Sequence, residues 1–371
     1  MSSSGKKRVL IVDDAVVVRK TLSDAIAGDP DLEVVGTAGN GRIALAKFPA
    51  LKPDVVLLDI EMPEMDGLET VRELRKIDPT VPIIMFSALT ERGAAATLEA
   101  LSRGASDYVT KPSTADATAT LQTIAGDVIP KIRAFCRLPD LRSGSTRAEP
   151  RLLSSIPVVR PPKSPAPIQV VAIGVSTGGP NALAQLLPTL PADLPIPVVI
   201  AQHMPPMFTS LLAARLAAKS ALPVRECVSG EPLAAGCVVV APGDFHMVAC
   251  REGKAVCLRT HQEPRENFCR PSVDVLFRSI AAVYGARALG VVLTGMGRDG
   301  FNGCEALCSV GARVYVQDEA SSVVWGMPGF VARAGLADKI LPLGQIGAEI
   351  VRAAMMQPNA TQAAARPSSS T

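Results

Sequence analysis

The sequence is poor in the residues that mark several large classes of protein. Aromatic residues make up only 4% of its 371 residues, and it contains three histidines. Its eight cysteines include no C-x-x-C pair, so their pattern supports neither a disulfide framework nor a zinc cluster. Nucleic-acid binding is not expected either, because it needs a basic face with stacking aromatic residues. What is left is a globular protein whose hydrophobic residues are mostly not aromatic.

Long hydrophobic runs are also missing. After the N-terminal MSSSGKKR only residues 9–12 are continuously apolar before two aspartates follow, which is too short for a signal peptide or a membrane span. We therefore expect a cytoplasmic protein that is not inserted in a membrane. With 48% hydrophobic and 20% charged residues the chain is not wholly disordered, and its length predicts two domains.

The first 125 residues contain five short apolar runs separated by segments that suit helices: VLIVDD, VVGTA, VVLLD, PIIMFSA and DYVTK. This alternation predicts a parallel α/β domain. Asp13 and Asp14 end the first run, and Asp59, Ser87 and Lys111 end the third, fourth and fifth. Because ligands of open parallel sheets bind at the carboxyl ends of the strands, we expect these five side chains to converge.

Three converging carboxylates repel one another, and a hard divalent cation relieves that repulsion. Mg²⁺ suits a site of few carboxylates, waters and a phosphoryl group, so Asp14 and Asp59 are candidate ligands and Asp13 a ligand or a support. Asp59 is then a candidate phosphoryl acceptor. Lys111 would neutralise the added charge and Ser87 would donate a hydrogen bond to it. Taken singly, each residue also has an ordinary interpretation as a helix cap, a surface charge or a loop hydroxyl.

Taken together, these residues resemble the receiver domain of two-component response regulators, over about residues 8–125. The resemblance implies a flavodoxin-like (βα)5 fold and phosphorylation of Asp59 by a histidine kinase. It also implies that Tyr108 is the aromatic switch residue and that the bond between Lys111 and Pro112 is cis. Ser87 replaces the commoner threonine but keeps the hydroxyl.

The segments between and after the two expected domains have a different composition. Residues 126–167 begin as the end of a helix and continue as a Pro/Ser/Arg-rich stretch, which predicts a semi-rigid linker. This stretch is basic, with 8 Lys and Arg against 3 Asp and Glu in residues 126–168, while residues 1–125 are acidic, with 14 against 18. We expect the tail, residues 356–371, to be disordered.

Residues 168–355 again alternate strands and helices, and three of their polar residues suggest hydrolysis. Ser176 follows the apolar run 170–173 in a G-x-S-x-G turn, which can expose its hydroxyl and leave backbone N–H groups for an oxyanion. His203 and Asp299 follow two other apolar runs. If the three strands are neighbours in a parallel sheet, His203 can act as the base for Ser176 and Asp299 can orient the imidazole.

Other interpretations remain open at this level. Ser176 or Thr177 could simply cap a helix, and His246 is the second candidate for the base. The glycines of G-x-G-x-x-G at 295–300, with Asp318 after the next strand, have nearly the spacing of a dinucleotide fingerprint, which predicts an NAD-binding dehydrogenase domain. A non-catalytic response-regulator output is a third possibility, although the sequence has no helix-turn-helix signature.

Longer motifs in this second half occur together and in order: AIGVSTGGP, QHMPPMFT, residues 267–277, LTGMGRDG and QDEASSVVWGMPG. They resemble the chemotaxis protein-glutamate methylesterases, whose domain order the receiver-like first half also matches. The resemblance implies a doubly wound parallel α/β hydrolytic domain with Ser176, His203 and Asp299 as the catalytic triad. Thr177 and the backbone N–H of Met296 are implied as serine and oxyanion supports. Met207 stands where many relatives have glycine.

This resemblance also implies a function. The expected enzyme is a phosphorylation-activated serine hydrolase that needs no cofactor for ester hydrolysis, removes methyl groups from glutamate methyl esters on chemoreceptors, releases methanol and deamidates receptor glutamines. The expected partners are methylated chemoreceptors and a chemotaxis histidine kinase. From the charge split we also expect the unphosphorylated acidic receiver to exclude the receptor, with the basic linker tethering it at high effective concentration.

Overall fold

The computed structural model of the chain describes residues 5–111, 117–138 and 167–355. It divides into two compact units, Met1–Ser154 and Ser155–Thr371. The expected linker segment 139–166, the expected tail 356–371 and the Pro112 side of the expected cis bond lie outside the described residues. No helix in the described ranges is both long and apolar enough to cross a membrane.

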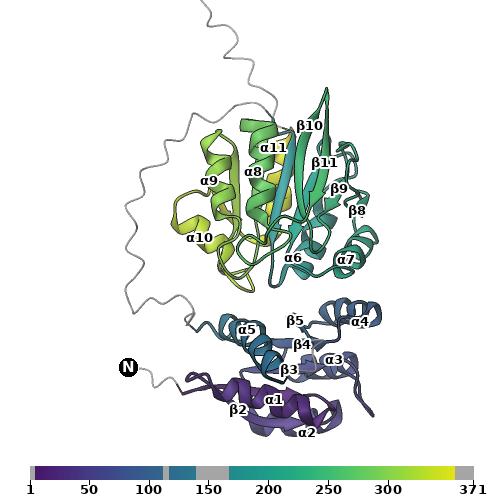
Figure 1. Ribbon diagram of the computed structural model, residues 1–371, viewed down its shortest axis with the longest axis vertical. Coiled ribbons are helices and arrows are strands. Elements are labelled where there is room, and N and C mark those ends of the chain that lie inside the picture. The colour runs from purple at the N-terminus through teal and green to yellow at the C-terminus, as the bar shows by residue number, and fades with distance from the viewer. Residues whose placement is uncertain (1–4, 112–116, 139–166, 356–371) are drawn as a thin grey trace, which may run out of the picture. The chain divides into compact units, whose positions relative to one another are not determined.

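The first unit (Figure 1) contains a five-stranded parallel sheet. Its strand order is β2-β1-β3-β4-β5. Its strands are β1 (Lys7–Val12), β2 (Leu32–Ala38), β3 (Val55–Asp59), β4 (Ile83–Ser87) and β5 (Asp107–Thr110). Its helices are α1 (Val16–Ala27), α2 (Gly41–Leu51), α3 (Gly67–Ile77), α4 (Glu91–Ser102) and α5 (Ala117–Phe135). All residues of β3 and β4 are buried, as expected for strands covered on both faces. The five predicted strands and the (βα)5 fold are confirmed.

Helix α5 is continuous across residue 125, where the predicted domain ends. Arg133 near its C-terminus binds Asp29 at 2.7 Å and Asp31 at 2.9 Å, which ties this end of α5 to the turn between α1 and β2. The first structural unit therefore includes residues that the sequence grouped with the linker.

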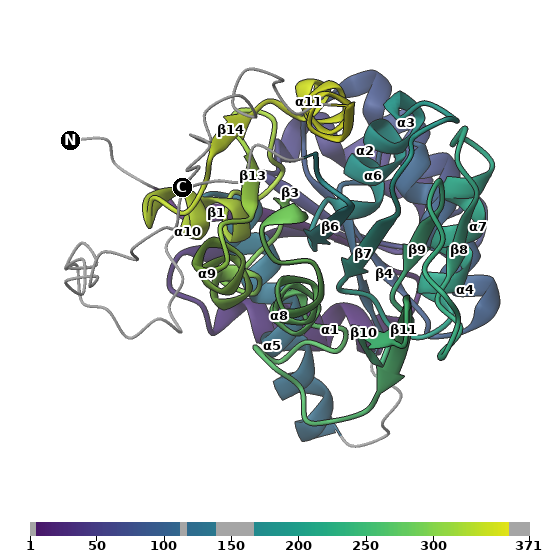
Figure 2. The same cartoon turned by 90° about the horizontal axis from the view of Figure 1, so that it is seen from above.

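The second unit is a seven-stranded parallel sheet with the order β14-β13-β12-β6-β7-β9-β8. Its strands are β6 (Val170–Val175), β7 (Val198–Gln202), β8 (Val224–Glu226), β9 (Val238–Val240), β12 (Ala288–Val292), β13 (Arg313–Gln317) and β14 (Lys339–Leu341). Its α-helices are α6 (Gly179–Leu186), α7 (Phe208–Ala217), α8 (Val273–Tyr284), α9 (Phe301–Ser309), α10 (Met327–Arg333) and α11 (Leu343–Met355). Helices α8 and α9 lie on one side of this sheet and α6 and α11 on the other (Figure 2). The predicted doubly wound architecture is confirmed.

A hairpin of β10 (His246–Glu252) and β11 (Ala255–His261) forms a separate antiparallel sheet. The sequence analysis did not predict it, and it changes the position assigned to His246. That residue starts β10 and does not follow β9 directly.

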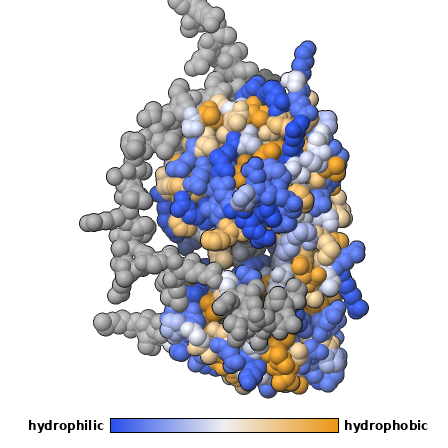
Figure 3. Space-filling model, in the orientation of Figure 1, coloured by the Kyte–Doolittle hydropathy of each residue, from blue (hydrophilic) through white to orange (hydrophobic). Residues whose placement is uncertain are grey.

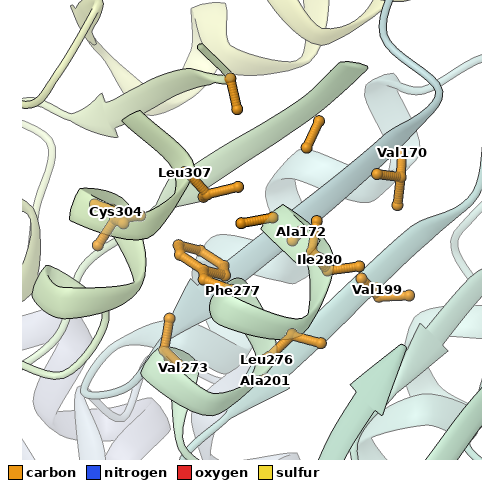
Figure 4. Packing of buried hydrophobic residues seen from close by; sticks show 14 of the residues in the cluster. Val170, Ala172, Val199, Ala201, Val273, Leu276, Phe277, Ile280, Cys304 and Leu307 are labelled. Atoms are coloured by element: carbon orange, nitrogen blue, oxygen red, sulfur yellow. The ribbon is translucent and has the colours of Figure 1, made fainter. Parts of the chain in front are cut away.

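One hydrophobic core of the second unit lies between the sheet and α8. Leu276, Phe277 and Ile280 of α8 pack beside Ala172 of β6 and Leu307 of α9 (Figure 4). All five side chains are almost completely buried. On the face seen in Figure 3, hydrophilic surface alternates with separate hydrophobic patches.

The direction in which successive strands are added to the sheet reverses at β6, because β7 lies on one side of it and β12 on the other. In doubly wound sheets such a switch point leaves a crevice at the carboxyl ends of the strands, where ligands bind. The residues that follow β6, β7 and β12 therefore meet at one place.

Candidate functional site

The acidic residues of the first unit gather at the carboxyl edge of its sheet. Asp13, Asp14 and Asp59 each offer an oxygen, and these atoms lie within 4.8 Å of one another. Lys111 Nζ lies 2.9 Å from Asp13 Oδ2 and 2.8 Å from Asp59 Oδ2. A cavity of about 290 Å³ opens beside them, lined in part by Asp14, Asp59, Ser87 and Lys111. The structure thus brings together the five strand-end residues selected from the sequence.

Burial raises the pKa of Asp59 to about 6, although the hydrogen bond from Lys111 acts in the opposite direction. The nearby negative charge of Asp13 adds to the increase. Desolvation lowers the pKa of Lys111, but the bonds to the carboxylates outweigh it and the net shift is upward. An oxygen-only donor set with excess negative charge fits a hard cation such as Mg²⁺.

Two of the predicted supports have other contacts in this structure. The Ser87 hydroxyl donates to the Gly93 carbonyl at 3.1 Å, so it is engaged with α4. Tyr108 is only 7% exposed, and Lys131 Nζ lies 5.3 Å from the centre of its ring. Tyr108 therefore already occupies a buried position.

In the second unit, Ser176 begins the turn between β6 and α6. The turn is held by a hydrogen bond from its own N–H to the Thr294 carbonyl at 3.1 Å. Gly178 has a φ of 77° and stands at the N-cap of α6, so the second glycine of the G-x-S-x-G motif has the left-handed backbone that glycine adopts readily. Ser176 is half-buried, and its Oγ makes no hydrogen bond with the described residues.

His203 and Asp299 form a close side-chain pair, with His203 Nε2 2.7 Å from Asp299 Oδ2. His203 follows β7, and Asp299 lies in the loop between β12 and α9. Desolvation acts against the charged imidazole, but the neighbouring Cys269 sulfur and the Asp299 carboxylate raise the pKa of His203 above its usual value.

Asp299 is a strongly stabilised carboxylate. Burial alone would raise its pKa, but hydrogen bonds from His203, the Val273 N–H and the Ser272 hydroxyl lower it to about 2. The Asp274 N–H and the Asn267 amide also donate to it. Two of these donors are backbone groups at the N-terminus of α8, where the helix dipole favours a negative charge. Asp299 is therefore ionised at neutral pH.

The two residues predicted to support the serine and the oxyanion lie beside Ser176. Thr177 follows it directly, and Met296 follows Gly295, where a Cβ would lie 2.9 Å from Ser176 Cβ. The backbone N–H groups of Thr177 and Met296 have no acceptor among the described residues. Both are therefore available to a negative oxygen beside Ser176.

Several residues around this site were not foreseen. Cys269 Sγ lies 3.5 Å from His203 Nδ1, and Asn267 and Ser272 hold Asp299. The Gln202 amide donates to the carbonyls of both Ser176 and His203. The motif at residues 267–277 pointed to this region but assigned no role to these side chains, because a side chain that reaches the site from a loop leaves no periodic signal in the sequence.

The rival candidates have other contacts. His246 accepts a hydrogen bond from the Ser272 N–H and lies 3.1 Å from the Pro264 carbonyl, so both its ring nitrogens face backbone groups. Asp274 accepts from Asn267 and Gly303. Asp318, the expected ribose ligand of a dinucleotide site, accepts from Ser321 within its own turn. None of the three contacts His203.

Met207, which stands where many members of the similar family have glycine, has a φ of 68°. This left-handed backbone explains why glycine suits the position. Met207 is also 40% exposed, so the side chain fills no core space.

Comparisons with known proteins agree with both halves of the chain. The family model "CheB methylesterase" matches residues 171–350 and the "Response regulator receiver domain" model matches residues 9–122. A protein-glutamate methylesterase/protein-glutamine glutaminase of Trichodesmium erythraeum is 48% identical over 358 residues, which cover 94% of this chain and 99% of the relative. One from a Nocardioides species is 49% identical and covers 93% of this chain and 94% of its own length.

Among solved structures, the CheB methylesterase catalytic domain of Thermotoga maritima is 38% identical, with a TM-score of 0.49. It covers 50% of this chain and 99% of its own length. The similarity to the curated relatives extends over 93 to 94% of this chain, and the span matched by the "CheB methylesterase" model contains Ser176, His203 and Asp299. The chain therefore belongs to the family of protein-glutamate methylesterase/protein-glutamine glutaminases that carry an N-terminal receiver domain.

Proposed function

We propose that this protein hydrolyses glutamate methyl esters and deamidates glutamines on chemoreceptors, with Ser176 as the nucleophile. The observation that carries the proposal is the pair of His203 and the ionised Asp299 beside the Ser176 turn, on three neighbouring strands. Deamidation uses the same steps, because an acyl-enzyme forms in both reactions and water resolves it.

The contacts of His203 assign a role to each ring nitrogen. Nε2 faces Asp299, so in the neutral imidazole it carries the proton and Nδ1 is left to accept one. Ser176 Oγ gives its proton to Nδ1 as it attacks the ester carbonyl, and Asp299 stabilises the imidazolium that forms. The N–H groups of Thr177 and Met296 stabilise the oxyanion. The imidazolium then protonates the leaving methanol.

Ser176 and His203 are not hydrogen-bonded in this structure. Nucleophile and base are often poorly aligned before substrate binds and tighten in the complex. The Ser176 side chain is tied to no other described group, so rotation about its χ1 torsion is not opposed by a competing bond.

In the receiver domain, Asp59 is the proposed phosphoryl acceptor and a chemotaxis histidine kinase the proposed donor. Asp13, Asp14 and Asp59 would hold Mg²⁺, which neutralises phosphoryl oxygens when bound. Lys111 would pair with the added charge. Ser87 would have to leave the Gly93 carbonyl to donate to the phosphoryl group. We place this reaction in the cytoplasm, where the kinase and the receptor signalling segments would be reached.

The decisive experiment measures methanol released from methyl-labelled receptors, with Mg²⁺ and a small phosphodonor. Ser176→Ala removes only the nucleophilic oxygen, so turnover should fall to background while Asp59 phosphorylation and folding stay as in the wild type. Ser309→Ala is a matched control, because Ser309 is exposed and bonds only within α9. Substantial turnover by the Ser176→Ala protein would contradict the assignment.

A further inference from the structure

The imidazole of His203 has a second potential partner, the thiol of Cys269. Cys269 Sγ lies 3.5 Å from His203 Nδ1, and Asp299 holds the opposite nitrogen at 2.7 Å. A nucleophile in reach of a base that a third group orients is the arrangement that activates nucleophiles in enzymes. Cys269 is half-buried and the His203 side chain is 13% exposed, so the pair is not sealed from solvent.

The position of this thiol is fixed by the catalytic loops. Glu266 and Cys269 exchange backbone hydrogen bonds of 3.2 and 2.9 Å across a two-residue turn. The turn residue Asn267 donates its amide hydrogens to Asp274 and to Asp299, each at 2.9 Å. The carboxylate that orients His203 therefore also anchors the turn that presents the sulfur to it.

The environment of Cys269 differs from that of the other cysteines. Burial raises the pKa of Cys136 and of Cys227 to about 11 and also raises that of Cys237, which disfavours their thiolates. Cys237 is half-buried like Cys269, and each thiol donates to a nearby carbonyl, Ala234 at 3.0 Å for Cys237 and Asn267 at 3.3 Å for Cys269. The difference is the imidazole, because Cys269 Sγ lies beside His203 Nδ1 and no histidine among the described residues contacts Cys237. Since the thiolate is the reactive form of cysteine, a sulfur beside a proton-accepting imidazole should react first.

We propose that Cys269 is a reactive thiol that shares His203 with Ser176, and that its oxidation by hydroperoxides or its alkylation by soft electrophiles blocks the active site. The Cys269 thiol gives its proton to His203 Nδ1, and the thiolate attacks one peroxide oxygen. An S–O bond forms, the O–O bond breaks, and the departing oxygen takes the proton from the imidazolium and leaves as water or an alcohol. Sulfur is oxidised to sulfenic acid and the peroxide is reduced.

The loss of esterase activity rests on the proposed function, because Nδ1 is the nitrogen left to accept the Ser176 proton. A sulfenic acid or an alkyl group on Cys269 would occupy the space beside that nitrogen. The reactivity of the thiol itself rests only on the Cys269, His203 and Asp299 contacts, so it can be measured separately.

The first measurement is the rate of alkylation of each cysteine in the full-length protein by limiting iodoacetamide at pH 7, read by peptide mass spectrometry. Cys269 should be labelled about tenfold faster than Cys237, and His203→Gln should slow Cys269 by a similar factor, because it removes the proton acceptor. Cys237 labelling should not change in that variant. Equal rates for Cys269 and Cys237, or no effect of His203→Gln, would overturn the proposal whether or not the protein is an esterase.

The second measurement is methanol release after treatment with hydrogen peroxide, each variant being compared with its own untreated sample. Wild type and Cys237→Ser should lose activity in parallel with oxidation of Cys269, and dithiothreitol should restore it. Cys269→Ser and Cys269→Ala should keep their activity through the treatment. If the two Cys269 variants lose activity as wild type does, the blocking step is wrong even where the thiol is reactive. If no variant releases methanol before treatment, the proposed function fails and the labelling result still stands.

Discussion

Two buried aspartates lie at the carboxyl ends of two parallel sheets in this chain, and their pKa values move in opposite directions. Asp59 is 4% exposed and Asp299 is 2% exposed, yet the pKa of Asp59 rises to about 6 and that of Asp299 falls to about 2. Burial raises the pKa in both cases. The difference must therefore come from the groups that surround each carboxylate.

Asp59 accepts one backbone hydrogen bond, from the Ile60 N–H, and one bond from Lys111, which it shares with Asp13. Asp299 accepts five hydrogen bonds, and no other carboxylate among the described residues contacts its partner His203. A carboxylate that is fully hydrogen-bonded is fixed as an anion and serves as a permanent charge for His203. A carboxylate such as Asp59, which accepts few hydrogen bonds and lies next to a second carboxylate, is better suited to accept a phosphoryl group.

Among the variants that test this comparison, Asp299→Asn should have the largest effect on activity. The amide cannot stabilise the imidazolium and favours the wrong tautomer of His203, so methanol release should fall by roughly 10³ to 10⁴-fold. Asp274→Asn is the matched control, since Asp274 lies in the same cluster without contacting His203. An Asp299→Asn protein within twofold of wild type would show that another acid orients the base.

The effect of the receiver domain on the esterase domain can be measured by removing the receiver domain. If the unphosphorylated receiver excludes the receptor, a chain of residues 168–355 should demethylate receptors faster than the unphosphorylated full-length protein. A coupling of about 2 to 3 kcal/mol corresponds to tens to a hundredfold, measured as methanol release without a phosphodonor. Asp59→Ala in the full-length chain should stay slow and not respond to a phosphodonor. Equal rates for the short and full-length chains would favour activation by direct contact instead of exclusion.

The sequence predicted both sheets because their strands are continuous apolar runs with polar residues at the ends, as in β3 with Asp59 and β7 with His203. It did not predict the β10–β11 hairpin, whose alternating residues are interrupted by charges. Nor did it predict Cys269 or Gln202 as neighbours of the site. Their positions depend on how loops pack in three dimensions, which neither spacing nor periodicity records.

Asp59→Asn tests whether the raised pKa of Asp59 affects the free energy of unfolding. The pKa of Asp59 in the folded protein, about 6, lies above its ordinary value of 3.8, so its ionised form destabilises the fold. This cost is absent below pH 3.8, grows between pH 3.8 and 6 and is complete above pH 6. At pH 8 the variant should raise the free energy of unfolding by on the order of 2 kcal/mol.

Urea unfolding of residues 1–138 at pH 8 and at about pH 3.5 measures this effect, and the gain should vanish at the lower pH. Asp66→Asn is the control, because Asp66 is exposed and caps α3 through an oxygen that asparagine also provides. A gain of equal size at both pH values would mean that packing, and not ionisation, accounts for it.

The smallest expected effect concerns the turn that anchors Asp299. Phe268 has a φ of 63° and is 95% exposed, so it adopts a left-handed backbone without burying its ring in return. Glycine adopts this conformation at little cost, and Phe268→Gly should raise the free energy of unfolding by about 0.5 to 1 kcal/mol. Phe268→Ala keeps the Cβ and hence the strain, so the difference between the two variants, measured by urea unfolding of the full-length chain at pH 7, isolates the backbone term. If both variants are destabilised alike, the ring makes a stabilising contact that outweighs the strain. If only Phe268→Gly is stabilised, backbone strain in the turn between Glu266 and Cys269 lowers the free energy of unfolding. No such strain arises at Asp59, whose backbone lies in a regular strand.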